Sequence, residues 1–414
     1  MSPVKPDIDR IGSKTRLTGL FLLLTLLVAP LAGCAAYGPG LTRTSHLAYN
    51  EAVQVSAQQE LLLNLVRLRY TDAPEFLAIN SISAQMSFDL GASLDGDFGE
   101  VEDSTSAFIA PGISAGYSER PTLSFTPERG AEFTRQLVAP VGLDSLYLLT
   151  QYGWSLERVL RLVATDINGI RNTINRELSS GDQAVALRSF AELAGHLSQL
   201  QNDGAIQIGV LERREVISPP LAPATVSASA ILDAASQGFR YAYLDDSSSL
   251  VLTANEQYYV LNLVQAARSK QEFSSLAHRL GLETDLASYD LDPAGTVSGL
   301  PAERTVRIAT RSVLGVMAYL SQAVQVPRAH VDRGLAIPEE EVQGILSDIL
   351  TIRVADQAPD KNALSVPYRG RWFYIEDSDL NSKRTLGLLT SLYRLQIRTG
   401  GAQNVPVLTL PVSR

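Results

Sequence analysis

The segment Gly112–Gly116 reads Gly-Ile-Ser-Ala-Gly and matches the Gly-x-Ser-x-Gly pattern in which serine hydrolases present their nucleophile. That chemistry requires a sharp turn from a strand into a helix, which exposes the serine hydroxyl above a sheet. Here the pattern opens a strand-like alternation, and Arg120 and Pro121 follow it where a helix would be needed. We therefore interpret Ser114 as a small strand residue beside a loop, and we nominate no catalytic residue.

Histidine is the usual general base and a frequent metal ligand, and the chain has four: His46, His196, His278 and His330. They lie far apart in the sequence, and neither a His-Glu-x-x-His pattern nor a nearby cysteine accompanies any of them. We expect His196 and His278 to be partly exposed polar positions on helices. The histidines thus predict neither a metal site nor a general base.

Two acidic stretches have the alternating oxygen donors with which a calcium loop begins. The first, Asp95–Asp97, lacks the later glycine and the bidentate glutamate of such a loop, and we expect a solvated acidic loop there. The second, Asp377–Asn381, has Leu388 where that glutamate would stand, and it precedes an expected helix from Ser382. Because Asp and Asn are favoured at helix N-termini, we interpret this second stretch as capping residues. We predict no metal and no cofactor.

Other chemistry is either excluded or left open by composition. The net charge of −9 argues against a nucleic-acid partner, and no glycine-rich loop precedes a helix to hold a phosphate. Trp154 and Trp372 have apolar neighbours and are expected to pack in cores. Carboxylate pairs for cleavage of a polymer remain open, because so many acidic residues offer more pairs than one sequence can resolve.

The single cysteine, Cys34, excludes an intramolecular disulfide, a cysteine-based zinc site and an iron–sulfur cluster. It stands at the end of a segment with a basic start, an apolar stretch over residues 20–29 and small residues after it. The apolar stretch is shorter than the roughly 20 residues of a membrane-spanning helix. These features are typical of a secretory signal peptide, which we expect over residues 1–33.

The last four residues of that segment, Leu31-Ala32-Gly33-Cys34, resemble the lipobox of bacterial lipoproteins. The resemblance implies cleavage between Gly33 and Cys34, attachment of diacylglycerol to the Cys34 thiol, and acylation of the new amino terminus with a fatty acid such as palmitate. Ala35 in place of aspartate implies, by the same resemblance, passage to the outer membrane. The alternative is an ordinary signal peptide in which a cysteine happens to follow Gly33.

Removing residues 1–33 takes four basic and two acidic residues from totals of 35 and 44, which leaves a net charge of −11. An acidic chain is not attracted to anionic lipid headgroups, so lipid rather than charge is expected to hold it at the membrane. Residues 34–45 contain Gly-Pro-Gly and no periodicity, and we expect a tether.

Beyond the tether, helical and strand patterns alternate without βαβ regularity, which predicts an α+β fold with mainly antiparallel sheets packed with helices in two lobes. We place an N-terminal lobe at residues 46–214, with an acidic loop at 91–111, and a C-terminal lobe at residues 227–414. A linker over residues 215–226 separates them, because Ser218–Pro223 is rich in proline.

Several local elements follow from periodicity. We expect a helix over Asn50–Tyr70, a β-bulge at Asn80–Ser81 and a helix containing Val313, Val316, Met317, Leu320 and Val324. We also expect a hairpin of residues 364–368 and 371–375 that turns through Arg369-Gly370, and a final strand over residues 405–410.

Four segments together resemble a group of proteobacterial envelope lipoproteins: Tyr117–Thr122, Gly153–Ser155, Thr310–Met317 and Arg371–Ile375. The resemblance covers most of the mature chain and implies an envelope location, but no activity. We therefore expect a lipid-anchored protein of the periplasm or outer membrane with a non-enzymatic interaction or structural role and an envelope protein as partner. The alternatives are a periplasmic hydrolase that cleaves an envelope polymer through unidentified carboxylates, and a ligand-binding lipoprotein that feeds a transporter.

Overall fold

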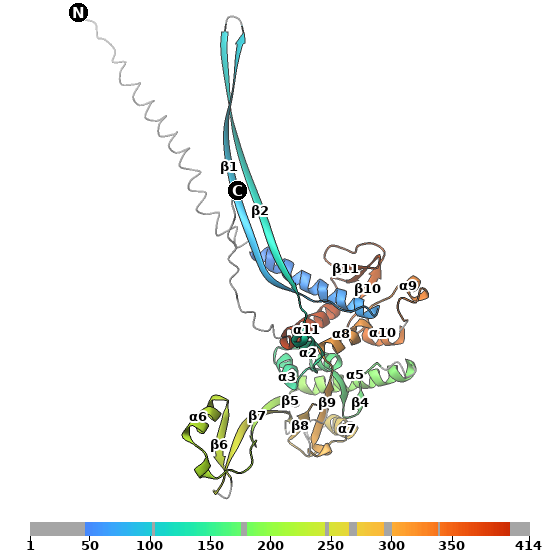
Figure 1. Cartoon of the computed structure of the whole chain (residues 1–414). Helices are drawn as coiled ribbons and strands as arrows, with labels where there is room; N and C mark the ends of the chain where they lie inside the picture. Colours follow the sequence, from blue (N-terminus) through green and yellow to red (C-terminus); the bar gives the residue numbers. More distant parts are fainter. Residues whose placement is uncertain are drawn as a thin grey trace, which may run out of the picture. The chain divides into compact units, whose positions relative to one another are not determined.

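The computed structural model describes residues 46–101, 104–174, 180–244, 248–264, 271–293, 300–337 and 340–397 (Figure 1). The expected signal peptide, the expected tether with Cys34, and the expected strand over residues 405–410 lie outside the described residues. The described residues form helices and mainly antiparallel strands with one parallel pair, so the α+β prediction is confirmed. The first described element is a helix over residues 46–69, near the bounds expected from its leucines.

A two-stranded antiparallel ribbon follows this helix (Figure 1). Its strands, β1 (Leu77–Val101) and β2 (Ser104–Pro127), pair with each other from one end to the other. The register shifts between Ile79 and Ser81, which confirms the predicted β-bulge. At about 3.3 Å per residue, the 25 residues of β1 extend over roughly 80 Å.

The expected acidic loop over residues 91–111 is wrong, because β1 runs to Val101 and β2 begins at Ser104, so all the described residues of this stretch are in strands. Glycine and aspartate are depleted in strands, and their presence here concealed an alternation that continues with Leu94, Gly96 and Phe98. Each of these residues has a partner on β2, so cross-strand pairing maintains a strand where local composition favours a loop.

A seven-stranded sheet lies in the described part of the larger unit, with the strand order β4-β3-β9-β8-β7-β5 and with β6 paired to β7. Only β8 and β9 run parallel. The strands are β3 (Ala164–Ile167), β4 (Ile170–Arg171), β5 (Ile206–Val216), β6 (Phe239–Tyr243), β7 (Leu250–Leu263), β8 (Ser288–Asp292) and β9 (Thr305–Thr310).

This sheet corrects the expected boundary between two lobes. Strand β5 pairs with β7 from Ile206↔Leu263 to Val216↔Thr253, and β3 pairs with β9, so strands from both sides of residues 215–226 share one sheet. The described residues from Leu62 onward belong to one compact unit, and those before Leu62 belong to another. The proline-rich segment is thus a connection within a sheet, because strands far apart in sequence pair across it.

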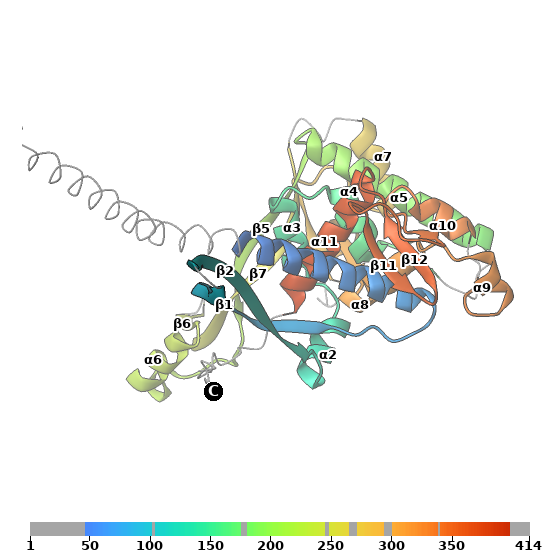
Figure 2. The ribbon, with the colours of Figure 1, turned by 90° about the horizontal axis from the view of Figure 1, so that it is seen from above.

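Helices surround a core that is centred on α8 (Val313–Ser321). Val313, Val316, Met317 and Leu320 are fully buried, as their helical spacing predicts, and α8 contacts α2, α4 and α11. Val324, expected in the same helix, is also buried but lies beyond the end of α8. Helix α5 packs against both α4 and α10 (Figure 2). The other helices are α2 (Ala131–Val138), α3 (Leu143–Gln151), α4 (Leu156–Val163), α5 (Ser180–Asn202), α6 (Ala228–Ser236), α7 (Gln271–Leu280), α9 (Arg328–Asp332), α10 (Glu340–Leu346) and α11 (Leu380–Gln396).

A three-stranded sheet completes the described fold, with β10 (Arg353–Ala355) and β11 (Leu364–Tyr368) on either side of β12 (Arg371–Ile375). Strands β11 and β12 form the predicted hairpin. Its turn residues Arg369 and Gly370 both have positive φ, at 46° and 76°, as a two-residue turn that matches the strand twist requires.

A buried arginine joins the sheet to the helices. Arg311, between β9 and α8, donates hydrogen bonds from its guanidinium to the carbonyls of Leu162 at 3.0 Å and Ala164 at 2.6 Å, and also to that of Asn172. Its guanidinium lies 4.0 Å from the centre of the Tyr319 ring, a cation–π contact. No carboxylate among the described residues forms an ion pair with it, and burial lowers its pKa to about 10.

We predict that Arg311→Met destabilises the protein by about 3 kcal/mol or more. The buried carbonyls of Leu162 and Asn172 would lose this donor, and each such loss costs about 1–3 kcal/mol. Arg304→Met is the matched control, because Arg304 is half-exposed and pairs with Glu283 at 3.4 Å, a contact worth under about 1 kcal/mol. Urea unfolding measures both variants, and equal losses would contradict the assignment.

Candidate functional site

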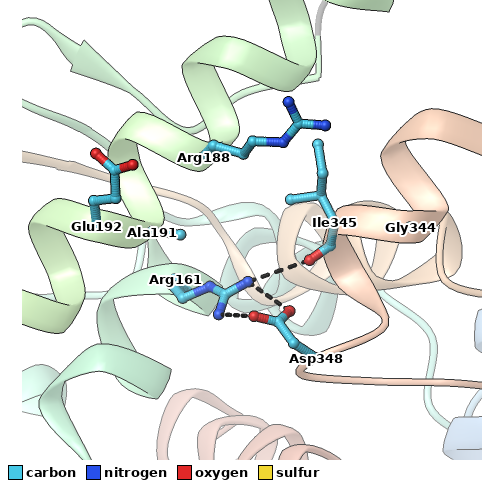
Figure 3. A pocket seen from close by; sticks show the side chains of 7 residues that line it. All are labelled: Arg161, Arg188, Ala191, Glu192, Gly344, Ile345 and Asp348. Atoms are coloured by element: carbon cyan, nitrogen blue, oxygen red, sulfur yellow. Dashed lines mark hydrogen bonds and ion pairs between the residues drawn. The ribbon is translucent and has the colours of Figure 1, made fainter.

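A charged cavity of about 630 Å³ lies where α4, α5 and α10 meet (Figure 3). Helix α4 contributes Arg161, α5 contributes Arg188 and Glu192, and Asp348 comes from the segment that follows α10. The remaining lining residues are Ala191, Gly344 and Ile345. The cavity therefore holds two cations and two carboxylates from distant parts of the chain.

An ion pair between Arg161 and Asp348 forms one wall of the cavity. The guanidinium binds both carboxylate oxygens, at 2.7 and 2.8 Å (Figure 3). It also contacts Glu157, one helical turn earlier, at 3.3 Å. Arg161 is buried by the packing of α4, whereas the Asp348 side chain is 58% exposed. Burial alone would lower the pKa of Arg161, but the hydrogen bond and charge of Asp348 raise it above its ordinary value. Arg161 therefore stays charged and acts by electrostatics rather than by proton transfer.

A second cavity, of about 240 Å³, shares Arg161 and Asp348 with the first and adds Arg158 from the same helix. Arg158 donates to the carbonyl of Asn381 at 3.2 Å and to the Thr385 hydroxyl at 2.5 Å, which ties α4 to the first turn of α11. Burial lowers the pKa of Arg158, and the charge of Arg384 adds to the effect. Arg158 thus positions helices rather than presenting a free cation.

The two carboxylates of the larger cavity bear on the hydrolase alternative. Hydrolysis by two carboxylates needs one that can give up a proton, and Asp348 is instead held by a bidentate ion pair with Arg161. Glu192 lies 3.7 Å from Arg279 and is largely exposed. Arg188 extends over the cavity in Figure 3 and makes no hydrogen bond or ion pair within the described part of the chain. This arrangement is better suited to holding helices together than to catalysis.

A buried tyrosine–histidine pair forms a separate polar cluster. The Tyr70 hydroxyl and His330 Nδ1 are 2.7 Å apart and hydrogen-bonded. Burial raises the pKa of Tyr70 to about 12. Burial also lowers the pKa of His330, and the cations Arg371, Arg333 and Arg369 lower it further. His330 is therefore neutral at pH 7, and this pair is a buried structural contact that no cavity described here reaches.

Neighbouring groups surround the pair with charge. Asp72 accepts hydrogen bonds from the Tyr368 hydroxyl and from Arg369, the latter at 2.9 Å. The Tyr368 bond, more than the Arg369 bond and charge, lowers the pKa of Asp72 despite its partial burial. The Arg369 guanidinium lies 5.1 Å from the centre of the Tyr70 ring. The β11–β12 turn is thus fastened to the end of the first helix.

The residues that the sequence singled out do not converge on one site. Ser114 is exposed on β2, and its hydroxyl contacts the carbonyl of Gly91 on β1 at 3.3 Å, so it occupies no nucleophile turn. Cys34 and Gly33 lie outside the described residues. Trp154 and Trp372 are half-buried rather than in the core. Asp379 caps α11 by accepting from the Ser382 amide at 3.0 Å, which confirms the capping prediction.

Sequence reasoning missed Arg158, Arg161 and Asp348. The only local signal is that two arginines lie three positions apart in a helix that is apolar apart from them and Glu157, which by itself is ordinary amphipathicity. Asp348 follows Arg161 by 187 residues and Asn381 follows Arg158 by 223, so these pairings cannot be seen from spacing.

The β1–β2 ribbon is the other candidate for a functional surface. Its described side chains include Asp89, Ser93, Ser114 and Arg120, and all of these are exposed. Among the strands that the structure describes, none pairs with the outer edge of either ribbon strand. A sheet of two strands has little stability of its own in water, so such a ribbon is typical of a surface that another molecule covers.

No protein-family model, curated protein or solved structure matches the chain. In the described ranges, no cluster of three or more histidine, cysteine or acidic residues is arranged to bind a metal ion. No helix within those ranges is both long and apolar enough to cross a bilayer.

We predict that Asp348→Asn lowers the free energy of unfolding by about 2 kcal/mol, because the buried Arg161 would lose its charged acceptor. Glu192→Gln is the control from the same cavity, since its exposed contact with Arg279 is worth under about 1 kcal/mol. Chemical denaturation of both variants measures the difference, and a larger loss in the control would refute the role of the ion pair.

We predict that stability falls as the pH is lowered from about 6.5, and that His330→Asn reduces this dependence. The unfolded histidine takes up a proton near pH 6.5, whereas the folded one resists it, so acid favours unfolding. His196 is exposed, so His196→Asn should leave the pH dependence of stability unchanged. Denaturation midpoints measured at several pH values below about 6.5 give the pH dependence of stability for each variant. Identical profiles for the two variants would count against the prediction.

Proposed function

We propose that the chain is a lipid-anchored lipoprotein of the cell envelope, held through Cys34 at the periplasmic face of the outer membrane. Its role is non-enzymatic: it binds or structurally supports other envelope components. The observation that carries this proposal is the β1–β2 ribbon, whose long outer edges have no partner strand in the described structure.

The anchor is supported by sequence chemistry. The segment Leu31–Cys34 combines small residues for peptidase access with the one thiol in the chain. Several acyl chains give stable membrane attachment, whereas one chain alone is marginal at about 0.8 kcal/mol per buried CH₂. An acidic mature chain gains nothing from anionic headgroups, so attachment depends on the lipid.

The interaction role is supported by how the polar groups are used. Arg158, Arg161 and Asp348 line the cavities, but their hydrogen bonds join helices of the same chain. The ribbon, in contrast, keeps a row of main-chain donors and acceptors on each outer edge. Such edges recognise another strand by main-chain hydrogen bonding, which is a common mode of protein recognition.

We predict that Cys34→Ser releases the protein from the membrane fraction or leaves the precursor unprocessed, because serine cannot carry the thioether-linked lipid. Fractionation and the mass of the mature amino terminus measure this. Ser124→Ala, a change at an exposed position of the ribbon, is the control and should leave attachment intact. Unchanged attachment and processing in Cys34→Ser would exclude the anchor.

The same membranes test the interaction role. When these membranes are solubilised in mild detergent, the wild-type chain should be recovered in a complex of fixed stoichiometry. Light scattering measures the mass of the complex, and mass spectrometry identifies its components. Recovery as a lone monomer would contradict an interaction role.

A further inference from the structure

The register of the β1–β2 ribbon sorts its residues into two sets. Residues directly opposite each other share a face, and successive residues alternate between faces. From Ile82 to Phe98, the even-numbered residues of β1 and their partners on β2 are almost all apolar or small. On β1 they are Ile82, Ala84, Met86, Phe88, Leu90, Ala92, Leu94, Gly96 and Phe98; opposite them on β2 are Leu123, Pro121, Glu119, Tyr117, Ala115, Ile113, Pro111, Ile109 and Ala107.

Two prolines show where the backbone groups of this set point. Pro121 pairs with Ala84 and Pro111 with Leu94, and proline has no N–H with which to form the mutual bonds of a hydrogen-bonded pair. Both are therefore non-hydrogen-bonded pairs, and by alternation so are the other pairs of the set. At such positions the N–H and C=O groups point away from the ribbon partner, toward the outer edges.

The two outer edges therefore differ in how many main-chain N–H donors they present. On β2, prolines remove an outward donor at positions 111 and 121, which is a common protection against unwanted pairing. On β1, no proline, lysine or arginine occurs anywhere from Leu77 to Val101. From Ile82 to Phe98, the outer edge of β1 is thus a long, uninterrupted template for strand pairing.

A lipid surface alone does not fit this edge, because hydrocarbon offers no partner for its backbone groups. The expected strand over residues 405–410 of the same chain is shorter than the stretch from Ile82 to Phe98 and contains Pro406, so it could cover only part of it. A second copy of β1 has the same length and no proline. It matches the whole edge.

We propose that two copies of this chain associate by antiparallel pairing of the outer edges of their β1 strands about a two-fold axis at Leu90. This inference deepens the proposed function, on which it rests, by naming the partner of the ribbon. Such an interface is self-complementary and closed, so it produces a dimer rather than a filament. The two ribbons form one four-stranded sheet, and their apolar sets lie on the same face.

This register is compatible with the charges of β1. It places Asp89 opposite Gly91, Asp95 opposite Gln85 and Asp97 opposite Ser83 of the second copy, so no two acidic residues are directly opposed. The strands are nevertheless both acidic and carry no basic residue. Added salt therefore strengthens the dimer, the reverse of an association that depends on ion pairs.

The register is tested by disulfide formation in the full chain with Cys34→Ser, which removes the only native thiol. Across the two-fold axis position 87 is opposite position 93, in a non-hydrogen-bonded pair with Cα atoms about 4.5 Å apart, within disulfide range. A mixture of Ser87→Cys and Ser93→Cys chains should form a disulfide-linked dimer. Each variant alone should not, because its own two copies lie about 20 Å apart along the strands.

The choice of edge is tested by two matched substitutions in the same Cys34→Ser chain. Ala92→Pro removes an outward donor from β1, and Ala115→Pro removes one from β2; neither position donates within the ribbon. Ala92→Pro should weaken dimerisation at least tenfold in sedimentation equilibrium, and Ala115→Pro should leave it unchanged.

Four results would overturn the proposal: a monomeric chain at micromolar concentration, equal effects of the two prolines, cross-linking by either cysteine variant alone, or a monomer that binds phosphatidylcholine vesicles through the ribbon. Because this chain has no Cys34 thiol, none of these results depends on lipidation. A monomer here together with a complex containing a different protein in the membrane experiment would reject the dimer and retain the proposed function.

Discussion

The larger compact unit depends on a buried cation that is neutralised by carbonyl dipoles instead of a carboxylate. Arg311 joins the end of α4, the start of β3 and the segment after β4, and its neighbour Tyr319 donates to Asn172 at 3.1 Å. Asn172 in turn donates to the carbonyls of Arg161 and Ala164. A charge in this position is costly to bury, so the surrounding backbone must keep its geometry for every one of these bonds to form.

Other arginines also join separate elements of the fold, through carbonyls, hydroxyls or a carboxylate. Arg158 joins α4 to α11, Arg161 joins α4 to the end of α10, and Arg69 donates to the carbonyl of Ile337 at 2.7 Å. The guanidinium group suits this role because it carries five donors in a rigid plane and stays charged when buried. In the cavity where α4, α5 and α10 meet, Arg161 is engaged in this way, whereas Arg188 makes no hydrogen bond or ion pair within the described residues.

The ribbon differs from the core in that many of its main-chain polar groups have no partner within the pair of strands. Its backbone polar groups are satisfied within the pair only at every second residue, and the rest face outward. Stability is therefore concentrated in the helical core and its sheet, while unused hydrogen-bonding capacity is concentrated in β1 and β2.

The sequence by itself determined the local elements. The bulge near Ser81, the helix around Val316, the turn at Arg369-Gly370 and the cap at Asp379 all follow from periodicity, φ preference or side-chain bonding within a few residues. The expected anchor at Cys34 is also a local pattern, and it stays a prediction.

Only the tertiary structure decided which distant segments meet. The sequence placed a lobe boundary at residues 215–226 and a loop at 91–111, but β5 pairs with β7 across the first, and β1 pairs with β2 through the second. It also gave no sign that Arg161 would meet Asp348. Strand pairing and burial of charge depend on groups that spacing along the chain does not encode. The physical reason is that cross-strand hydrogen bonds and desolvation override local composition once the chain is folded.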